Sequence, residues 1–104
     1  MSKEIVFSGV QPTGEIHLGN YLGAIKQFLG FQDKSDSIFC IVDQHAITIF
    51  QDPNELRQNV LSVLSIFLAS GLDPQKCIIF NQASVKEHSV LSWYLSCTAR
   101  VGWL

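Results

Sequence analysis

The residues with the clearest chemical potential follow the first short apolar run of the chain. Residues 5–7 have the β-branched and aromatic character of a strand, and a loop over residues 8–14 leads into His17-Leu18-Gly19-Asn20. A helix that begins there would present free N–H groups and a positive dipole end, which attract an anion such as a phosphate. Gly19 allows a flat ligand to approach the backbone. His17 and Asn20 share one face of the first turn and can donate hydrogen bonds to that ligand.

This motif leaves several interpretations open when it is taken alone. The chain has neither a G-x-G-x-x-G fingerprint nor a G-x-x-x-x-G-K-[ST] loop, which argues against NAD binding and against an ordinary P-loop NTPase. A His and an Asn at a helix start are more often structural caps than ligand contacts. His45, beside Asp43, is equally consistent with a buried histidine whose hydrogen bonds are satisfied, and Trp93 and Trp103 are most simply packing residues.

The elements that must position these residues alternate between short strands and helices. Three strands are predicted, at residues 5–7, 37–42 and 77–80. The second is apolar on both faces, as a strand covered by helices on each side must be. Three helices are predicted, from about residue 18 to Gly30, from Asp52 to Gly71, and from a Ser84-x-x-Glu87 capping box onward. This order predicts an α/β fold with three parallel strands, right-handed crossovers and a Rossmann-like layout.

The ends of the predicted strands locate the site. Ligands bind to open parallel α/β sheets beyond the carboxyl ends of the strands. Here these ends are residues 8–14, Asp43-Gln44-His45 and Asn81-Gln82, which are polar or contain glycine although each follows a hydrophobic strand. We therefore expect the ligand at this edge of the sheet.

Composition excludes several classes of protein. Charged residues make up 15% of the 104 residues, against about 25% in an average soluble domain, and the net charge is −2. The basic residues are scattered, so the chain lacks the patch of a self-sufficient nucleic-acid binder. No signal segment and no membrane-length apolar stretch is found, so we expect a cytoplasmic protein without a membrane partner. The three cysteines lack C-x-x-C spacing, which favours buried thiols in a reducing compartment over a disulfide or metal role.

Long segments of the chain together resemble the N-terminal part of the tryptophanyl-tRNA synthetases. The likeness runs in register through essentially the whole sequence and separates this family from the related tyrosine enzyme. It is carried by Phe7-Ser8-Gly9-Val10-Gln11-Pro12-Thr13-Gly14, His17-Leu18-Gly19-Asn20-Tyr21, Gly23-Ala24-Ile25, Cys40-Ile41-Val42-Asp43-Gln44-His45-Ala46-Ile47-Thr48, Asp52-Pro53, Leu56-Arg57, Gly71, Asp73-Pro74 and Ala99-Arg100-Val101-Gly102-Trp103-Leu104. The HIGH signature of class I synthetases reads His17-Leu18-Gly19-Asn20 in this chain, with asparagine at its last position.

The resemblance implies a set of site residues on the HIGH-type nucleotidyltransferase fold. The implied catalytic residues are His17 and Asn20. The implied ATP-binding residues are Gln11, Pro12, Thr13, His17, Gly19 and Asn20. The implied tryptophan-binding residues are Phe7, Gly9, Gln11, Val42 and His45. No protein-bound metal is implied, since Mg²⁺ enters as part of the ATP complex.

The resemblance further implies a reaction and its partners. In a tryptophan–tRNA ligase, the carboxylate of L-tryptophan attacks the α-phosphorus of Mg-ATP, giving tryptophanyl-adenylate and pyrophosphate. The acyl group then passes to the terminal ribose of tRNA(Trp). Such a step needs positioning and charge stabilisation at phosphorus, and it needs no protein nucleophile. The family works as a homodimer, so a second copy of the chain is an expected partner.

The resemblance covers only the first portion of a synthetase catalytic domain. Residues 1–104 contain no K-M-S-K-S-type loop, no later helix whose acidic residue reads the indole N–H, and no anticodon-binding region. We therefore expect an incomplete Rossmann domain that is inactive or very weak alone. The deficit of charge then predicts that the sheet edges and the helix ending at Leu104 are surfaces that the rest of the protein covers. Two alternatives remain: a non-catalytic nucleotide-binding or interaction module of the same fold, and an adenylylating HxGH nucleotidyltransferase with another substrate.

Overall fold

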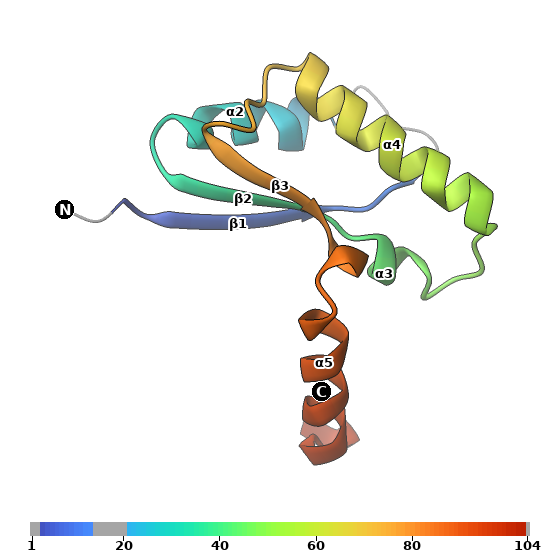
Figure 1. The fold of residues 1–104 in the computed structure, drawn as a ribbon. Coiled ribbons are helices and arrows are strands. Elements are labelled where there is room, and N and C mark those ends of the chain that lie inside the picture. Colours follow the sequence, from blue (N-terminus) through green and yellow to red (C-terminus); the bar gives the residue numbers. More distant parts are fainter. Residues whose placement is uncertain (1–2, 14–20, 104) are drawn as a thin grey trace.

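The chain folds around a parallel sheet of three strands. The computed structural model describes residues 3–13 and 21–103, and Figure 1 shows their arrangement. The strands are β1 (Ile5–Val10), β2 (Asp36–Ile41) and β3 (Cys77–Asn81), and they lie in the order β1-β2-β3. Strands alternate with helices along the chain, so the predicted α/β, Rossmann-like layout is confirmed. The predicted first strand was too short, because β1 continues to Val10.

Helices connect and flank these strands. A π-helical segment, Tyr21–Ile25, continues into α2 (Lys26–Gln32), so this helix runs past Gly30. A short helix that the sequence did not predict, α3 (Asp43–Ala46), follows β2 directly. The longest helix is α4 (Pro53–Ala69), and α5 (Glu87–Thr98) follows β3 after a 3₁₀ turn, Gln82–Ser84. A second 3₁₀ turn is formed by Val101–Trp103.

The ends of α4 follow the predicted signals. The Asp52 carboxylate accepts hydrogen bonds from the N–H groups of Asn54 (2.9 Å) and Glu55 (3.0 Å), and Pro53 occupies the first turn. Gly71, just beyond the helix, has φ +104°, a left-handed conformation that an L side chain rarely adopts. The cap and the terminating glycine therefore fix the helix within two residues of the predicted range.

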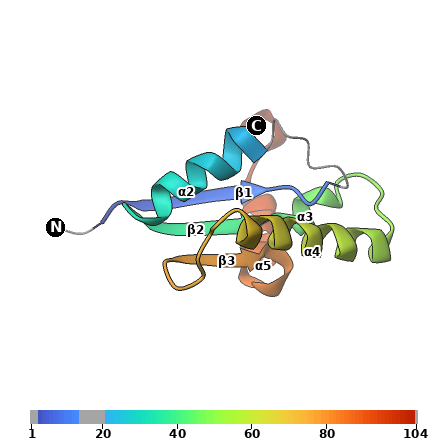
Figure 2. The ribbon, with the colours of Figure 1, turned by 90° about the horizontal axis from the view of Figure 1, so that it is seen from above.

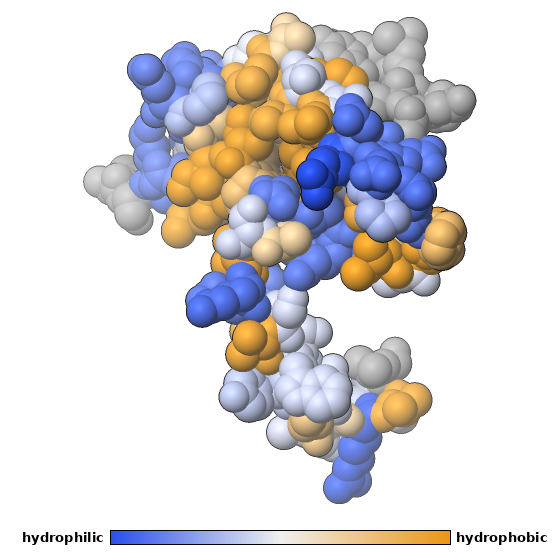
Figure 3. All heavy atoms as spheres, turned by 45° about the vertical axis from the view of Figure 1, so that its right-hand side comes forward, coloured by the Kyte–Doolittle hydropathy of each residue, from blue (hydrophilic) through white to orange (hydrophobic). Residues whose placement is uncertain are grey.

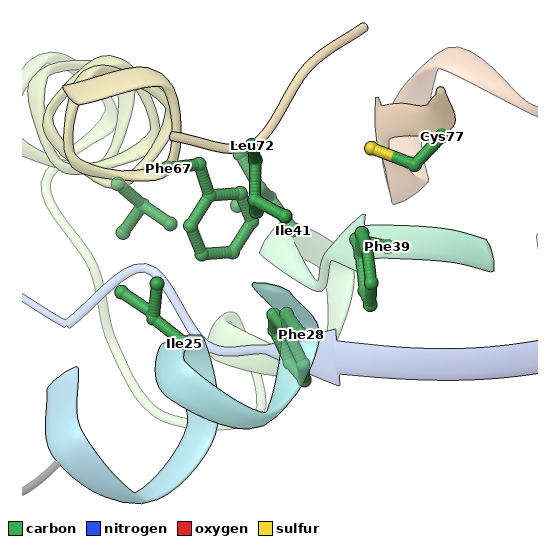
Figure 4. Packing of buried hydrophobic residues seen from close by; sticks show 8 residues of the cluster. Ile25, Phe28, Phe39, Ile41, Phe67, Leu72 and Cys77 are labelled. Carbon is green, nitrogen blue, oxygen red and sulfur yellow. The ribbon is translucent and has the colours of Figure 1, made fainter. Parts of the chain in front are cut away.

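The core lies between the sheet and the two longer covering helices. α2 and α4 lie on the same face of the sheet (Figure 1, Figure 2). The Phe28 ring of α2 stacks on Phe39 of β2 at 4.4 Å between centroids and meets Phe67 of α4 edge-on at 6.0 Å. Figure 4 shows Ile25, Ile41 and the same three rings converging on one cluster. Burial of these apolar side chains is the main force that holds the helices on the sheet.

The opposite face of the sheet is open, which corrects the expectation that helices cover β2 on both sides. Phe7, Ile38 and Ile78 are direct cross-strand partners and therefore share a face. The side chains of Phe7 and Ile78 are each 59% exposed. In the described part of the chain, α2 and α4 both lie on the other face. The apolar pattern of β2 therefore indicates a second covering layer that residues 3–13 and 21–103 do not provide.

Helix α5 projects away from the open side of the sheet (Figure 1), and Figure 3 shows it as a column separate from the body. Every residue from Ser89 to Trp103 is exposed. The predicted capping box does not form, because Ser84 belongs to the preceding 3₁₀ turn and α5 begins only at Glu87, without a side-chain cap. Cys40 and Cys77 are buried as expected, but Cys97 of α5 is exposed. Among the described helices, none has the length and hydrophobicity required to cross a membrane.

Candidate functional site

The carboxyl ends of the three strands meet at one edge of the sheet. The N–H of Val42, which follows β2, donates to the carbonyl oxygen of Val10 at the end of β1, at 2.9 Å. Asn81 at the end of β3 is paired with Ile41 of β2. Residues from three distant parts of the sequence therefore share this edge, where open parallel sheets bind ligands.

Gly9 and Val42 lie in direct contact at this edge. A Cβ atom added at Gly9 would lie 3.0 Å from Cγ1 of Val42 and 3.6 Å from the carbonyl oxygen of Cys40. The absence of a side chain at Gly9 therefore lets β1 pass this close to the residue after β2 without displacing the Val42 side chain. Phe7 lies two residues earlier on the same face of β1, with its ring centroid 6.5 Å from that of Phe80. The structure thus brings together Phe7, Gly9 and Val42, three of the residues predicted to bind tryptophan.

The segment predicted to bind ATP begins directly after β1. The Thr13 N–H donates to the carbonyl oxygen of Gln11 at 2.9 Å, which forms a tight turn. Pro12 is fully buried, whereas Gln11 and Thr13 are exposed. Pro12 therefore anchors the turn and leaves its two neighbours accessible to a ligand. The remaining predicted ATP-binding residues, His17, Gly19 and Asn20, lie outside the described residues, as does the helix start that carries them.

His45 is an exposed residue of α3, so the described residues do not bury its side chain. Its backbone N–H donates to Oε1 of Gln82 at 3.3 Å, and its carbonyl oxygen accepts from the Thr48 hydroxyl at 2.9 Å. His45 lines a hollow of about 460 Å³ between α3 and α5, together with His88 and Trp93. The backbone of His45 is thus fixed while its side chain faces open space.

Asp43 makes more side-chain hydrogen bonds than any other described residue of the site, and no sequence pattern indicated a role for it. It is 9% exposed, and its Oδ1 accepts from the N–H groups of Gln44 (3.0 Å) and Ala83 (2.9 Å). Its Oδ2 accepts from Nδ2 of Asn81 at 2.9 Å. The available signal was an aspartate directly after a buried strand and an asparagine at the end of the next strand, but their contact depends on strand adjacency.

The Asp43 carboxylate also influences a neighbouring thiol. Burial raises the pKa of Cys40 above that of an exposed thiol, and the negative charge of Asp43 raises the pKa further. Cys40 is therefore protonated at neutral pH and is a structural residue of the core, not a nucleophile. No group of three His, Cys, Asp or Glu side chains in residues 3–13 and 21–103 is arranged to hold a metal ion.

An open parallel α/β sheet with polar, glycine-bearing loops at its carboxyl edge defines a class of nucleotide-binding protein. Within that class, residues 2–104 match the family described as tRNA synthetases class I (W and Y), and the chain belongs to this family.

Individual relatives show which members of this family the chain resembles. The chain is 53% identical over 98% of its length to the tryptophan–tRNA ligase of Brucella melitensis biotype 1, and it spans 29% of that protein. It matches 31% of the Campylobacter jejuni tryptophanyl-tRNA synthetase structure complexed with ADP and tryptophan, at 44% identity over 94% of this chain and a TM-score of 0.88. The Mycoplasma pneumoniae tryptophanyl-tRNA synthetase gives the same TM-score at 34% identity, covering 98% of this chain and 29% of that one. The chain thus spans under a third of these relatives.

Proposed function

We propose that the protein containing these residues is a tryptophan–tRNA ligase, and that residues 1–104 are the N-terminal portion of its Rossmann catalytic domain. The observation that carries the proposal is the contact of Gly9 with Val42, beside exposed Phe7, at the carboxyl edge of the sheet. An apolar wall of this kind suits a flat indole ring. The 53% identity to a tryptophan–tRNA ligase supports tryptophan as the amino acid.

In this proposal, Phe7, Gly9, Gln11, Val42 and His45 bind tryptophan. Phe7 and Val42 supply apolar contact, while Gly9 leaves room for the ring. The exposed imidazole of His45 and the exposed amide of Gln11 are the polar groups available to orient the substrate. The neighbouring ATP would be held by Gln11, Pro12 and Thr13, and by His17, Gly19 and Asn20.

The proposed chemistry depends on positioning. The tryptophan carboxylate attacks the α-phosphorus of ATP, the bond to the bridging oxygen breaks, and pyrophosphate leaves with the Mg²⁺ that accompanied the nucleotide. Donors from His17 and Asn20 would stabilise the charge that develops on the phosphoryl oxygens. A ribose hydroxyl of tRNA(Trp) then attacks the acyl carbon of the adenylate, which forms the ester and releases AMP. The tRNA, a homodimeric assembly and a cytoplasmic location are further parts of the proposal, supported by the family.

The test is tryptophan-dependent exchange of pyrophosphate into ATP, measured on the protein expressed from the complete reading frame. We expect exchange with tryptophan, none with tyrosine, and a loss of at least about tenfold in His17→Ala and in Asn20→Ala, since about 1.4 kcal/mol of lost transition-state stabilisation costs tenfold. Exchange that depends on a different acid would contradict the proposal.

The same assay tests whether residues 1–104 suffice. We expect the 104-residue chain alone to be orders of magnitude slower than the complete protein, because the groups that hold pyrophosphate in the family are absent from it. Exchange by the short chain at the full rate would show that these residues form a complete catalytic unit. Nucleotide binding without exchange by the complete protein would instead favour a non-catalytic module.

A further inference from the structure

A hydrogen-bond network centred on Asp43 joins the ends of β2 and β3. The carboxylate accepts three hydrogen bonds of 2.9 to 3.0 Å, two of them from Asn81 and Ala83, which lie 38 and 40 residues further along the chain. Asn81 in turn accepts from the Ser84 hydroxyl through its own Oδ1. At 9% exposure, Asp43 is poorly hydrated, so these donors must replace the water that a carboxylate requires.

This network orients α3, which is too short to hold itself in place. A helix of four residues fixes its backbone for very few internal hydrogen bonds, so tertiary contacts must supply its stability. Its first-turn N–H groups are satisfied by side chains: that of Gln44 by the carboxylate of Asp43, the first residue of α3, and that of His45 by Gln82, which lies outside the helix. The direction of α3, and with it the place of the His45 side chain, therefore depends on residues 81–83.

We propose that Asp43 is a positioning residue of the tryptophan site, which ties the Val42–His45 segment to the segment after β3 so that Val42 and His45 face the substrate together. This inference rests on the proposed function, since it assumes that both residues contact tryptophan. Asp43 itself points into the protein, toward Asn81 and Ala83, and not toward the ligand. Its effect is therefore on substrate affinity through geometry.

The chemistry of the network suggests a swapped variant that preserves it. In Asp43→Asn/Asn81→Asp, the amide of residue 43 would donate to the carboxylate of residue 81. The carbonyl of residue 43 would still accept from Gln44 and Ala83, and the new carboxylate would still accept from Ser84. Asn81→Asp alone instead sets a half-buried carboxylate against the buried carboxylate of Asp43, and Asp43→Ala leaves three donors without a partner.

The experiment measures the dissociation constants of L-tryptophan and of a non-hydrolysable ATP analogue by calorimetry, on the protein from the complete reading frame. We expect Asp43→Ala and Asn81→Asp to weaken tryptophan binding about tenfold to a hundredfold, as the loss of one or two kcal/mol would. Binding of the ATP analogue should change less than about threefold, because residues 11–13, the described part of the proposed ATP-binding segment, are not among the hydrogen-bond partners of the Asp43 carboxylate. The swapped variant should bind tryptophan within about threefold of the unmodified protein.

Asp73→Ala is the matched control for a merely structural effect. Asp73 also receives a backbone hydrogen bond, from Gln75 at 2.9 Å, but it lies before β3, at the opposite edge of the sheet. Its removal should lower the thermal midpoint and leave tryptophan affinity unchanged. Exchange kinetics should separate the two roles as well, since Asp43→Ala should raise the KM for tryptophan more than it lowers kcat.

Two results would overturn the inference: native tryptophan affinity in Asp43→Ala, or a swapped variant that binds no better than Asn81→Asp. If Asp43→Ala does not fold, the comparison of the swapped variant with Asn81→Asp decides. Absence of tryptophan binding by the unmodified protein would mean that the proposed function has failed, and with it the premise of the inference.

Discussion

Both the packing of the sheet and the proposed substrate pocket favour a residue without a side chain at Gly9. A methyl group there would lie 3.0 Å from Val42, closer than side-chain carbons normally approach. We predict that Gly9→Ala lowers the free energy of unfolding by about 1 kcal/mol, as overpacking does, and weakens tryptophan binding. Urea denaturation and calorimetry on the protein from the complete reading frame measure the two effects.

Two variants sharpen that prediction. Val42→Ala removes the atom that the new methyl would meet, so Gly9→Ala should cost less stability in its presence. Gly30→Ala is the control, because no atom lies within 4 Å of the added methyl and alanine is preferred inside α2. It should stabilise the protein by up to about 1 kcal/mol. An unchanged free energy of unfolding in Gly9→Ala would mean that β1 can move away from Val42 without loss of stability.

The three cysteines should react at different rates, because only one is accessible. Burial is the main cause that raises the pKa of both Cys40 and Cys77, aided by Asp43 and Asp73 respectively, whereas Cys97 is exposed. We predict that, in the folded 104-residue chain, a thiol reagent modifies Cys97 promptly and the other two only after unfolding. Counting modified thiols by mass spectrometry, with and without denaturant, measures this. Prompt modification of Cys40 would mean that the sheet opens readily.

The same pKa shifts predict how alkali affects stability. The pKa values of Cys40 and Cys77 are higher in the folded protein than in the unfolded chain. The contribution of these thiols to the free energy of unfolding is therefore complete below the pKa of an unfolded thiol, about 8.5, and is lost as the pH rises beyond it. When denaturation is followed from neutral to alkaline pH, the free energy of unfolding should fall less in Cys40→Ala than in the unmodified protein. Cys97→Ala, at an exposed position, should leave the slope unchanged.

At the scale of elements, α4 is the helix whose stability can be tested most directly. Its N-terminus depends on the Asp52 carboxylate, which accepts from two N–H groups that have no partner within the helix. We predict that Asp52→Ala lowers the free energy of unfolding by about 1 kcal/mol, while Asp52→Ser, which retains an acceptor, loses less. Equilibrium denaturation is the measurement, and equal losses in the two variants would indicate an effect other than capping.

The sequence predicted α4 and the sheet because their signals are local. Asp52, Pro53 and Gly71 act on the residues beside them, and each strand contains a short apolar run that ends at polar or glycine residues. The Ser84 box failed because residues 82–84 form a 3₁₀ turn and α5 begins only at Glu87. A local pattern does not reveal where a turn after a strand gives way to the helix.

The candidate site was predictable only in part, because its residues act across strands. The resemblance named Phe7, Gly9 and Val42, and the structure brings these three together at one edge. The role of Asp43 depends on the pairing of β2 with β3, and no spacing in the sequence specifies that contact. The exposure of His45 depends on what else surrounds α3, which a histidine beside an aspartate does not indicate.

At the scale of the whole molecule, the low content of charged residues is matched by exposed apolar surfaces on the sheet and on α5. Ile5, Phe7 and Ile78 expose more than half of their side chains on the open face of the sheet. Ile5, Ile38 and Ile78 also line a shallow hollow of about 410 Å³ at its amino end. On α5, the exposed apolar side chains include Trp93, and Figure 3 shows most of this helix extending beyond the rest of the described chain, which it meets at its first turn. Apolar surfaces of this extent normally contact other protein.

We therefore predict that the 104-residue chain self-associates when it is produced alone, and that it binds a hydrophobic dye more strongly per residue than the complete protein does. Sedimentation velocity over a range of concentrations, together with dye fluorescence, measures both properties. Ile78→Lys should weaken the association, because a charge on an exposed strand position opposes burial of that face without touching the core.

Leu61→Lys is the matched control for this substitution. Leu61 is 51% exposed, close to the 59% of Ile78, but it lies on α4, away from the open face and from α5. The same change of charge at this position should leave self-association intact. A short chain that stays monomeric at all concentrations would show that the open face tolerates water. Equal effects of the two lysines would show that net charge, and not the uncovered sheet, controls the association.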